Sequence, residues 1–216
     1  MRILEGMSHF EKIVAFDLGK VLLDFDYMKS AGKLLPLCGV FPLKVLGILT
    51  GSGLLESLEL GEIGDDEFYE EVAKLTKFKG TREDFMEAFG NIFTPIDEMI
   101  SFHSELKRSG VKTYLFSNTN DTAVKWISEH YPFYNDFDGY FLSYKLKEAK
   151  PSDAFYIALE EATGKKGSDI IYIDDKKENI DAALKRGWHG IVFNSSHKVI
   201  PQVKALLGLS SCSVGS

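Results

Sequence analysis

Short apolar runs that end in polar residues recur along this chain of 216 residues. Each run is only a few residues long and is bounded by polar or turn-forming residues, a pattern that indicates a buried strand. Four runs are clear, and the run at 140–143 is a shorter candidate of the same kind. The expected strands cover residues 13–17, 111–117, 140–143, 170–174 and 190–193.

Between these runs, apolar residues recur at the spacing of an amphipathic helix. The pattern predicts helices over residues 96–109, 123–130, 153–163, 177–186 and 199–207. Strands that alternate with helices pair in parallel and form a layered α/β sheet. We therefore expect a Rossmann-like parallel sheet with helices on both faces.

Residues 27–93 break this alternation, since they contain no convincing strand. The acids that begin at Asp65 favour a helix start, and Thr81 opens a sequence of capping-box form. These signals predict an inserted all-α domain at 27–93, with residues 1–26 and 94–216 forming the α/β core. Within it, residues 33–55 are nearly all apolar and long enough to span a membrane, but Lys44 at the centre and two prolines argue against a span.

The composition narrows the class of protein. Hydrophobic residues make up 44% of the chain, enough for an α/β core with a small accessory domain. The net charge of −7 argues against nucleic acid as a main partner, because phosphate backbones attract basic surfaces. Cys38 and Cys212 fit neither a disulfide framework nor a zinc pattern, and residues 1–12 lack the apolar core of a signal peptide. Both features predict a cytoplasmic protein.

Three of the predicted strands end in residues whose side chains can take part in catalysis or ligand binding, namely Asp17, Ser117 and Asp174. Parallel α/β sheets bind ligands beyond the carboxyl ends of their strands. We therefore expect these three side chains to meet at one edge of the sheet. Apolar strands seldom end in a carboxylate without a function, so Asp17 is the most informative of the three.

Four short motifs then resemble those of the haloacid dehalogenase superfamily, in the subgroup of phosphohydrolases with a helical cap after the first motif. Residues 16–22, FDLGKVL, match the first motif and residues 115–118, LFSN, the second. Lys150 in AKPS matches the third, and residues 172–175, YIDD, the fourth. Each motif is weak alone, but the four in order and at strand ends form a specific combination.

The resemblance implies a phosphatase in which Asp17 attacks phosphorus to form an aspartyl-phosphate. Mg²⁺ would offset the repulsion between this carboxylate and the phosphate, because it is a hard cation that prefers oxygen ligands. The implied metal ligands are the Asp17 carboxylate, the backbone carbonyl of Gly19, Asp174 and Asp175. The implied phosphate-binding groups are Ser117, the backbone N–H of Asn118 and Lys150, and Lys150 would also hold Asp17.

Several of these residues also have structural interpretations when taken singly. Ser117-Asn118 is typical of a helix cap, and Lys150-Pro151 is typical of a solvated lysine before a helix. Asp174-Asp175 fits a cluster of acids at a helix start. The functional interpretation depends on the four motifs occurring together.

Gly19 departs from the family pattern, in which active phosphatases carry a second Asp at this position. That Asp protonates the leaving oxygen and later activates water, a contribution of about 10²–10⁴-fold. Another group could substitute, with Lys20, Asp24, Asp26, a water molecule or a residue of the cap as candidates. Alternatively, the substrate has a good leaving group, as in a sugar 1-phosphate, or the protein binds phosphorylated ligands with weak or no turnover.

We expect a Mg²⁺-dependent phosphatase for a small phosphorylated metabolite, similar to sugar-phosphate phosphatases, with a non-catalytic binder as the alternative. The expected partners are that metabolite only, with no nucleic acid and no membrane, in a monomer or homodimer. In the cap, Glu56, Glu59 and Glu62 fit either a solvated helix face or contacts to sugar hydroxyls. The apolar residues 34–55 fit either the core of the cap or the lining of a pocket or dimer patch.

Overall fold

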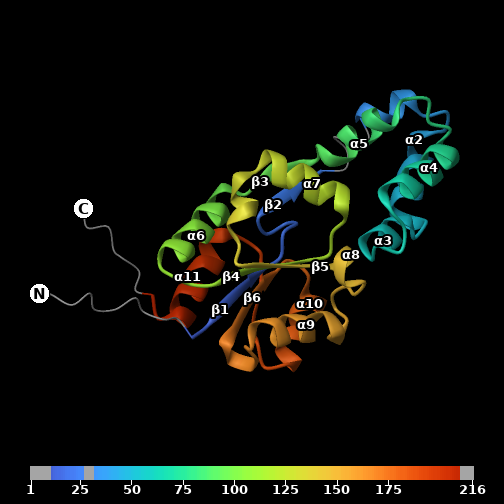
Figure 1. Cartoon of the computed structure of the whole chain (residues 1–216). Helices are drawn as coiled ribbons and strands as arrows, with labels where there is room; N and C mark the ends of the chain where they lie inside the picture. Colours follow the sequence, from blue (N-terminus) through green and yellow to red (C-terminus); the bar gives the residue numbers. More distant parts are fainter. Residues whose placement is uncertain (1–10, 27–31, 210–216) are drawn as a thin grey trace, which may run out of the picture.

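The centre of the molecule is a parallel sheet of five strands in the order β5-β4-β1-β6-β7 (Figure 1). The computed structural model describes residues 11–26 and 32–209. The N-terminal residues considered for a signal peptide and Cys212 lie outside this range. The strands are β1 (Ile13–Phe16), β4 (Thr113–Ser117), β5 (Gly139–Leu142), β6 (Ile170–Asp174) and β7 (His189–Val192). All five predicted strands are therefore present, and each predicted boundary lies within two residues of the observed one.

Side chains of the central strands alternate between two apolar cores, one on each face of the sheet. On β1, Val14 and Phe16 join one core, whereas Ile13 and Ala15 join the other. All four are 3% exposed or less, which explains why these strands read as continuous apolar runs. The sequence-based expectation of a parallel sheet covered on both faces is confirmed.

Helices cover both faces of the sheet. In Figure 1, α6 and α11 lie on one side of the sheet, and α9 and α10 lie on the other. Each of them packs apolar residues into the core on its own side. The bounds are α6 (Asp97–Arg108), α7 (Asp121–His130), α8 (Ser143–Leu146), α9 (Asp153–Thr163), α10 (Lys177–Lys185) and α11 (Ser196–Leu207), with short 3₁₀ turns at η2 (Pro132–Asp136) and η3 (Gly167–Asp169).

Residues 32–90, which we call the helical segment, project to one side of the sheet (Figure 1). It contains η1 (Leu35–Leu37), α2 (Pro42–Gly51), α3 (Leu54–Glu59), α4 (Asp65–Thr76) and α5 (Arg82–Gly90). These helices have an apolar cluster of their own, built around Phe68, Phe85 and Phe89. The predicted capping box forms, since the Thr81 side chain accepts from the Asp84 N–H and the Asp84 side chain accepts from the Thr81 N–H.

An antiparallel pair of short strands, which the sequence did not predict, stands at the two ends of the helical segment. The strands are β2 (Leu23–Phe25) and β3 (Phe93–Pro95), with Phe25 opposite Phe93. Their rings meet edge to face with centroids 6.5 Å apart. Each strand has only three residues, which is too short for an alternation of apolar and polar residues to be recognised in the sequence.

None of the described side chains of residues 34–55 lines the pocket described below. Leu34, Val45 and Ile48 are buried, whereas Phe41 and Leu43 are exposed. Burial of these three side chains among the helices follows from the ordinary drive to remove apolar surface from water. Across the described residues, no helix is both long and apolar enough to cross a membrane.

Candidate active site

The carboxyl ends of β1, β4 and β6 meet at one edge of the sheet and bring the three predicted side chains together. β1 is the middle strand of the three, with Phe16 in register with Leu115 on β4 and with Ile173 on β6. Asp17 follows β1 directly, while Ser117 and Asp174 are the last residues of β4 and β6. After β1 the chain forms β4 and β5 on one side of it and then returns to form β6 and β7 on the other side. This reversal of strand order is the switch point at which such sheets bind ligands.

Lys150 links two of these carboxylates from the loop before α9. Its Nζ lies 2.9 Å from Oδ1 of Asp17 and 2.7 Å from Oδ2 of Asp174, and it donates to the carbonyl of Phe116 at 2.9 Å. An ammonium group has three donors, so these contacts use all of them. The Lys150 side chain is 1% exposed, which makes it a fixed positive charge beneath the two acids.

The protonation of this cluster follows from burial and from the Lys150 charge. Burial raises the pKa of Asp17 to about 6, although the attraction of Lys150 opposes the shift. Burial would also raise the pKa of Asp174, but the charge and hydrogen bonds of Lys150 outweigh it and hold that pKa below its ordinary value. Burial would lower the pKa of Lys150, yet Asp17 and Asp174 raise it, so the lysine stays charged.

Asp174 is held by partners that sequence reasoning did not single out as site residues. The Tyr172 hydroxyl donates to its Oδ2, and Asn179 donates to both carboxylate oxygens at 3.0 and 3.1 Å. The backbone N–H of Lys176 donates to Oδ1 at 2.8 Å. Tyr172 lies two residues before Asp174 on β6, so both side chains project from the same face of the strand. The fourth motif contains Tyr172, but nothing in the sequence marks its hydroxyl as a partner of Asp174.

The donor set fits a hard divalent cation. One carboxylate oxygen from each of Asp17, Asp174 and Asp175 lies within 4.8 Å of the others. Asp175 is half-buried, and its pKa is raised by burial and by the neighbouring Asp174. The three clustered carboxylates repel one another when ionised, and a bound cation would relieve that repulsion.

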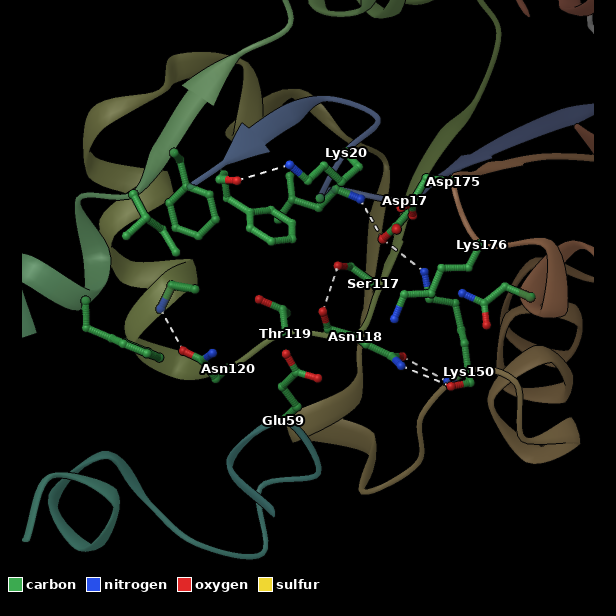
Figure 2. A pocket seen from close by; sticks show the side chains of 18 residues that line it. Asp17, Lys20, Glu59, Ser117, Asn118, Thr119, Asn120, Lys150, Asp175 and Lys176 are labelled. Carbon is green, nitrogen blue, oxygen red and sulfur yellow. Dashed lines mark hydrogen bonds and ion pairs between the residues drawn. The ribbon is translucent and has the colours of Figure 1, made fainter. Parts of the chain in front are cut away.

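Ser117 and Asn118 lie beside Asp17, at the end of β4, and both line the same pocket (Figure 2). The Asn118 side chain pairs with the backbone of Lys150, donating to its carbonyl at 3.0 Å and accepting from its N–H at 2.9 Å. Asn118 therefore ties the loop after β4 to the loop that carries Lys150. The Asn120 side chain caps α7 by accepting from the Ala123 N–H at 2.9 Å, so the expected cap falls on Asn120.

Comparison with known proteins agrees with this arrangement. A family model described as haloacid dehalogenase-like hydrolase matches residues 11–187, most of the chain and every motif quoted above.

The chain belongs to the haloacid dehalogenase-like hydrolases.

Curated relatives of this hydrolase include two phosphatases. A D-ribitol-5-phosphate phosphatase of Bacteroides thetaiotaomicron is 26% identical, over 82% of this chain and 89% of the relative. A sesquiterpene phosphatase of Aspergillus oryzae is 27% identical, over 91% of this chain and 97% of the relative.

Solved structures show the same fold. A family enzyme from Bacteroides thetaiotaomicron, in complex with magnesium and inorganic phosphate, matches with a TM-score of 0.74 and 23% identity over 87% of this chain and 98% of that one. A predicted family hydrolase from Porphyromonas gingivalis matches with a TM-score of 0.78 and 22% identity, over 91% of this chain and 97% of that one. The magnesium expected from the sequence agrees with the first of these structures.

The structure gives a packing reason for Gly19, the departure from the family pattern. A Cβ atom at this position would lie 2.9 Å from Cε1 of Phe25, closer than side chains normally approach. The Phe25 ring therefore takes the space that a side chain at position 19 would need. A Gly19→Asp variant on its own does not test the missing acid cleanly, because it also displaces this ring.

The pocket in front of Asp17 has a polar side and an apolar side. Its apolar lining includes Phe25 on β2, Phe93 on β3, Phe89 near the end of the helical segment and Ile92 just after it. Lys20 also lines it and forms an ion pair with Asp24. Asp24 and Asp26, the acids nearest to Gly19 along the chain, are not among the lining residues.

Glu59, the last residue of α3, also lines the pocket. Its side chain enters from the helical segment, with the carboxyl end toward Thr119 and Asn118 (Figure 2). Glu56 is exposed, and the Glu62 carboxylate accepts from Ser57 at 2.8 Å. Of the three glutamates considered from the sequence, Glu59 is thus the one that departs from the solvated face.

Proposed function

We propose that this hydrolase is a Mg²⁺-dependent phosphatase that cleaves a small phosphorylated metabolite through an aspartyl-phosphate on Asp17. The observation that carries the proposal is the buried Asp17–Lys150–Asp174 cluster at the head of a pocket, with Asp175 beside it. The named activities of the two curated relatives support it, since both are phosphatases.

Two contacts of Asp17 support its assignment as the nucleophile. Its Oδ1 accepts from the Leu18 N–H at 2.7 Å and from Lys150 at 2.9 Å. These contacts fix the carboxyl group through one oxygen, and such fixed geometry removes much of the entropic barrier to attack. Lys150 also keeps negative charge on Asp17, against the effect of burial.

The residues assigned to the metal are Asp17, Asp174, Asp175 and the backbone carbonyl of Gly19. Glycine at position 19 leaves that carbonyl available, because the assigned ligand belongs to the main chain. When bound, Mg²⁺ would neutralise charge on the phosphoryl oxygens and on the approaching carboxylate.

The residues assigned to the phosphate are Ser117, the backbone N–H of Asn118 and Lys150. Ser117 and Asn118 end β4 next to Asp17, so donors from a rigid strand end would face the transferring group. Rigidly placed donors stabilise the charge that develops in the transition state without reorganisation. Lys150 acts mainly by positioning, because its three donors are already used within the cluster.

Residues 27–93, which include the helical segment, are assigned as a cap domain. They supply Glu59, Phe89 and Ile92 to the pocket, so they contribute both polar and apolar walls around the leaving group. Sugar phosphates and other esters with good leaving groups are the substrate class we assign, because Gly19 cannot protonate a leaving oxygen.

A phosphate-release assay tests this proposal. Wild type and Asp17→Asn are compared with Mg²⁺ and with a chelator, on p-nitrophenyl phosphate, benzyl phosphate, ribitol 5-phosphate, sugar 1-phosphates and farnesyl phosphate. The expected result is Mg²⁺-dependent release by wild type and a loss of about 10⁴-fold or more in Asp17→Asn, as for removal of other covalent nucleophiles. Phosphate binding without turnover of any ester would instead identify the protein as a binder.

A further inference from the structure

Among the sugar phosphates and related esters proposed as substrates, those with an alkoxide leaving group need a proton on the leaving oxygen, and the usual donor position cannot supply one. Gly19 has no side chain, and the Phe25 ring occupies the adjacent space. The donor must therefore come from another part of the pocket.

Three carboxyl groups line the pocket among the described residues, on Asp17, Asp175 and Glu59. Asp17 and Asp175 belong to the acidic cluster assigned to the metal. Glu59 stands apart from that cluster and reaches the pocket from the helical segment (Figure 2). It is the carboxyl group left for proton transfer.

The backbone of Glu59 is anchored to the core next to the phosphate-binding loop. Ser143, fully buried just after β5, donates from Oγ to the Glu59 carbonyl at 2.5 Å. The same Oγ accepts from the Thr119 N–H at 2.9 Å. Lys147 donates to the Gly61 carbonyl two residues further on. These bonds hold the end of α3 against the loop that follows Ser117.

The surroundings of Glu59 favour a group that can exchange a proton near neutral pH. Burial raises its pKa to about 6, while the nearby Lys176 opposes the shift. Glu56 and Asp17 add to the rise, and Lys150 opposes it. Efficient general acids and bases have pKa values close to the working pH.

We propose that Glu59 is the general acid and base that replaces the acid missing at position 19. This inference rests on the proposed phosphatase function. In the first step, Asp17 forms a bond to phosphorus while the bond to the leaving oxygen breaks, and Glu59 gives its proton to that oxygen. The products are the free alcohol, the aspartyl-phosphate and an ionised Glu59.

In the second step, water attacks phosphorus and Glu59 accepts its proton. The bond between Asp17 and phosphorus breaks, which releases inorganic phosphate and restores both side chains. One water is consumed, and Glu59, which donates a proton to the leaving oxygen in the first step, regains a proton from this water in the second.

The test compares Glu59→Gln with wild type on two esters that each carry one aromatic ring. Benzyl phosphate has a poor leaving group that needs a proton, whereas p-nitrophenyl phosphate has a good one that does not. The expected result is a fall in kcat/KM of about 10²–10⁴-fold on benzyl phosphate, against less than about tenfold on p-nitrophenyl phosphate. Glu59→Asp, which keeps a carboxyl group, should retain more of the benzyl phosphate activity.

Glu56→Gln is the matched control, because Glu56 is an exposed glutamate on the same helix. It should leave both rates within about twofold. Equal falls on both esters in Glu59→Gln, or no change on either, would overturn the role of Glu59 while the phosphatase function stood. Absence of Asp17-dependent turnover in wild type would instead overturn the proposed function and this inference with it.

Discussion

At the scale of single residues, the Phe25 ring occupies the space that a side chain at position 19 would need. The ring of Phe25 packs on Phe93 and reaches to 2.9 Å from where a Cβ of residue 19 would lie. The absence of a side chain at position 19 and the aromatic wall of the pocket are thus two aspects of the same packing.

Gly19→Ala should lower the free energy of unfolding by about 1–3 kcal/mol, because overpacking forces the Phe25 ring to move. In a Phe25→Ala background, the same change should cost less than about 0.5 kcal/mol, since the clash is gone. Urea unfolding of the four proteins in this double-mutant cycle measures the coupling. Additive effects would show that the ring does not restrict residue 19.

His103 is a buried titratable group in the core beneath α6. Its ring is 0% exposed, its Nε2 lies 3.0 Å from Thr113 Oγ1, and its Nδ1 has no hydrogen-bond partner among the described residues. Burial lowers its pKa to about 4, with Lys107 adding to the fall and Asp136 and Asp138 opposing it. The histidine is therefore neutral in the folded protein at neutral pH.

The stability of the protein should fall in mild acid on account of His103. The unfolded chain protonates this histidine below its ordinary pKa of 6.5, whereas the folded chain does so only near 4. Unfolded molecules thus bind more protons in this window, and stability is lost as the pH falls through it. Between pH 7 and pH 5 the loss is about 2 kcal/mol. His103→Gln should lose less stability than wild type over the same interval in urea titrations, and an identical pH dependence would refute this assignment.

At the scale of elements, the end of α3 is the link between the helical segment and the catalytic edge of the sheet. Gly61 sits there with φ of 62°, and a Cβ on it would overlap the carbonyl oxygen of Tyr144. This close approach lets Ser143 and Lys147 bond to the segment.

Gly61→Ala should push the end of α3 away from the core and displace Glu59. A misplacement of about 1 Å can cost on the order of 10²-fold, so a fall of that size in kcat/KM on benzyl phosphate is expected. Gly64→Ala is the control, because its Cβ would point into open space three residues away. Similar activity in the two variants would mean that this contact does not position the pocket.

The sequence predicts the elements of the core well and those around the pocket less well. Strands such as β6 are buried on both faces, so their apolar runs are visible without knowledge of the fold. β2 and β3 have three residues each and depend on pairing with one another. No pattern within either segment indicates this pairing. Asp17 could be found because it ends an apolar strand. Phe25 could not be found, and Glu59 could not be distinguished from Glu56 and Glu62, because their positions depend on how the helical segment packs on the core.

At the scale of the whole molecule, one pocket is lined both by residues of the core and by residues of the helical segment. The acids assigned to the metal come from the ends of β1 and β6, which the sheet holds side by side. A cation that binds this folded arrangement, and not the unfolded chain, must stabilise the fold.

Mg²⁺ should therefore raise the midpoint of thermal unfolding. At a concentration one hundred times the dissociation constant, the gain in unfolding free energy is about 2.7 kcal/mol. Asp175→Asn should reduce this gain, because it removes one of the three clustered carboxylates. Thermal scans with and without Mg²⁺ measure both effects, and an unchanged midpoint in wild type would contradict the metal assignment.

In the proposed mechanism, Asp17 carries the phosphoryl group during turnover. The most direct test is rapid acid quenching of wild type during turnover of p-nitrophenyl phosphate with Mg²⁺, followed by peptide mass spectrometry. We expect the added mass of one phosphoryl group on the peptide that contains Asp17, and its absence in Asp17→Asn. Turnover by wild type with the phosphoryl group on another residue, or turnover retained in Asp17→Asn, would contradict it.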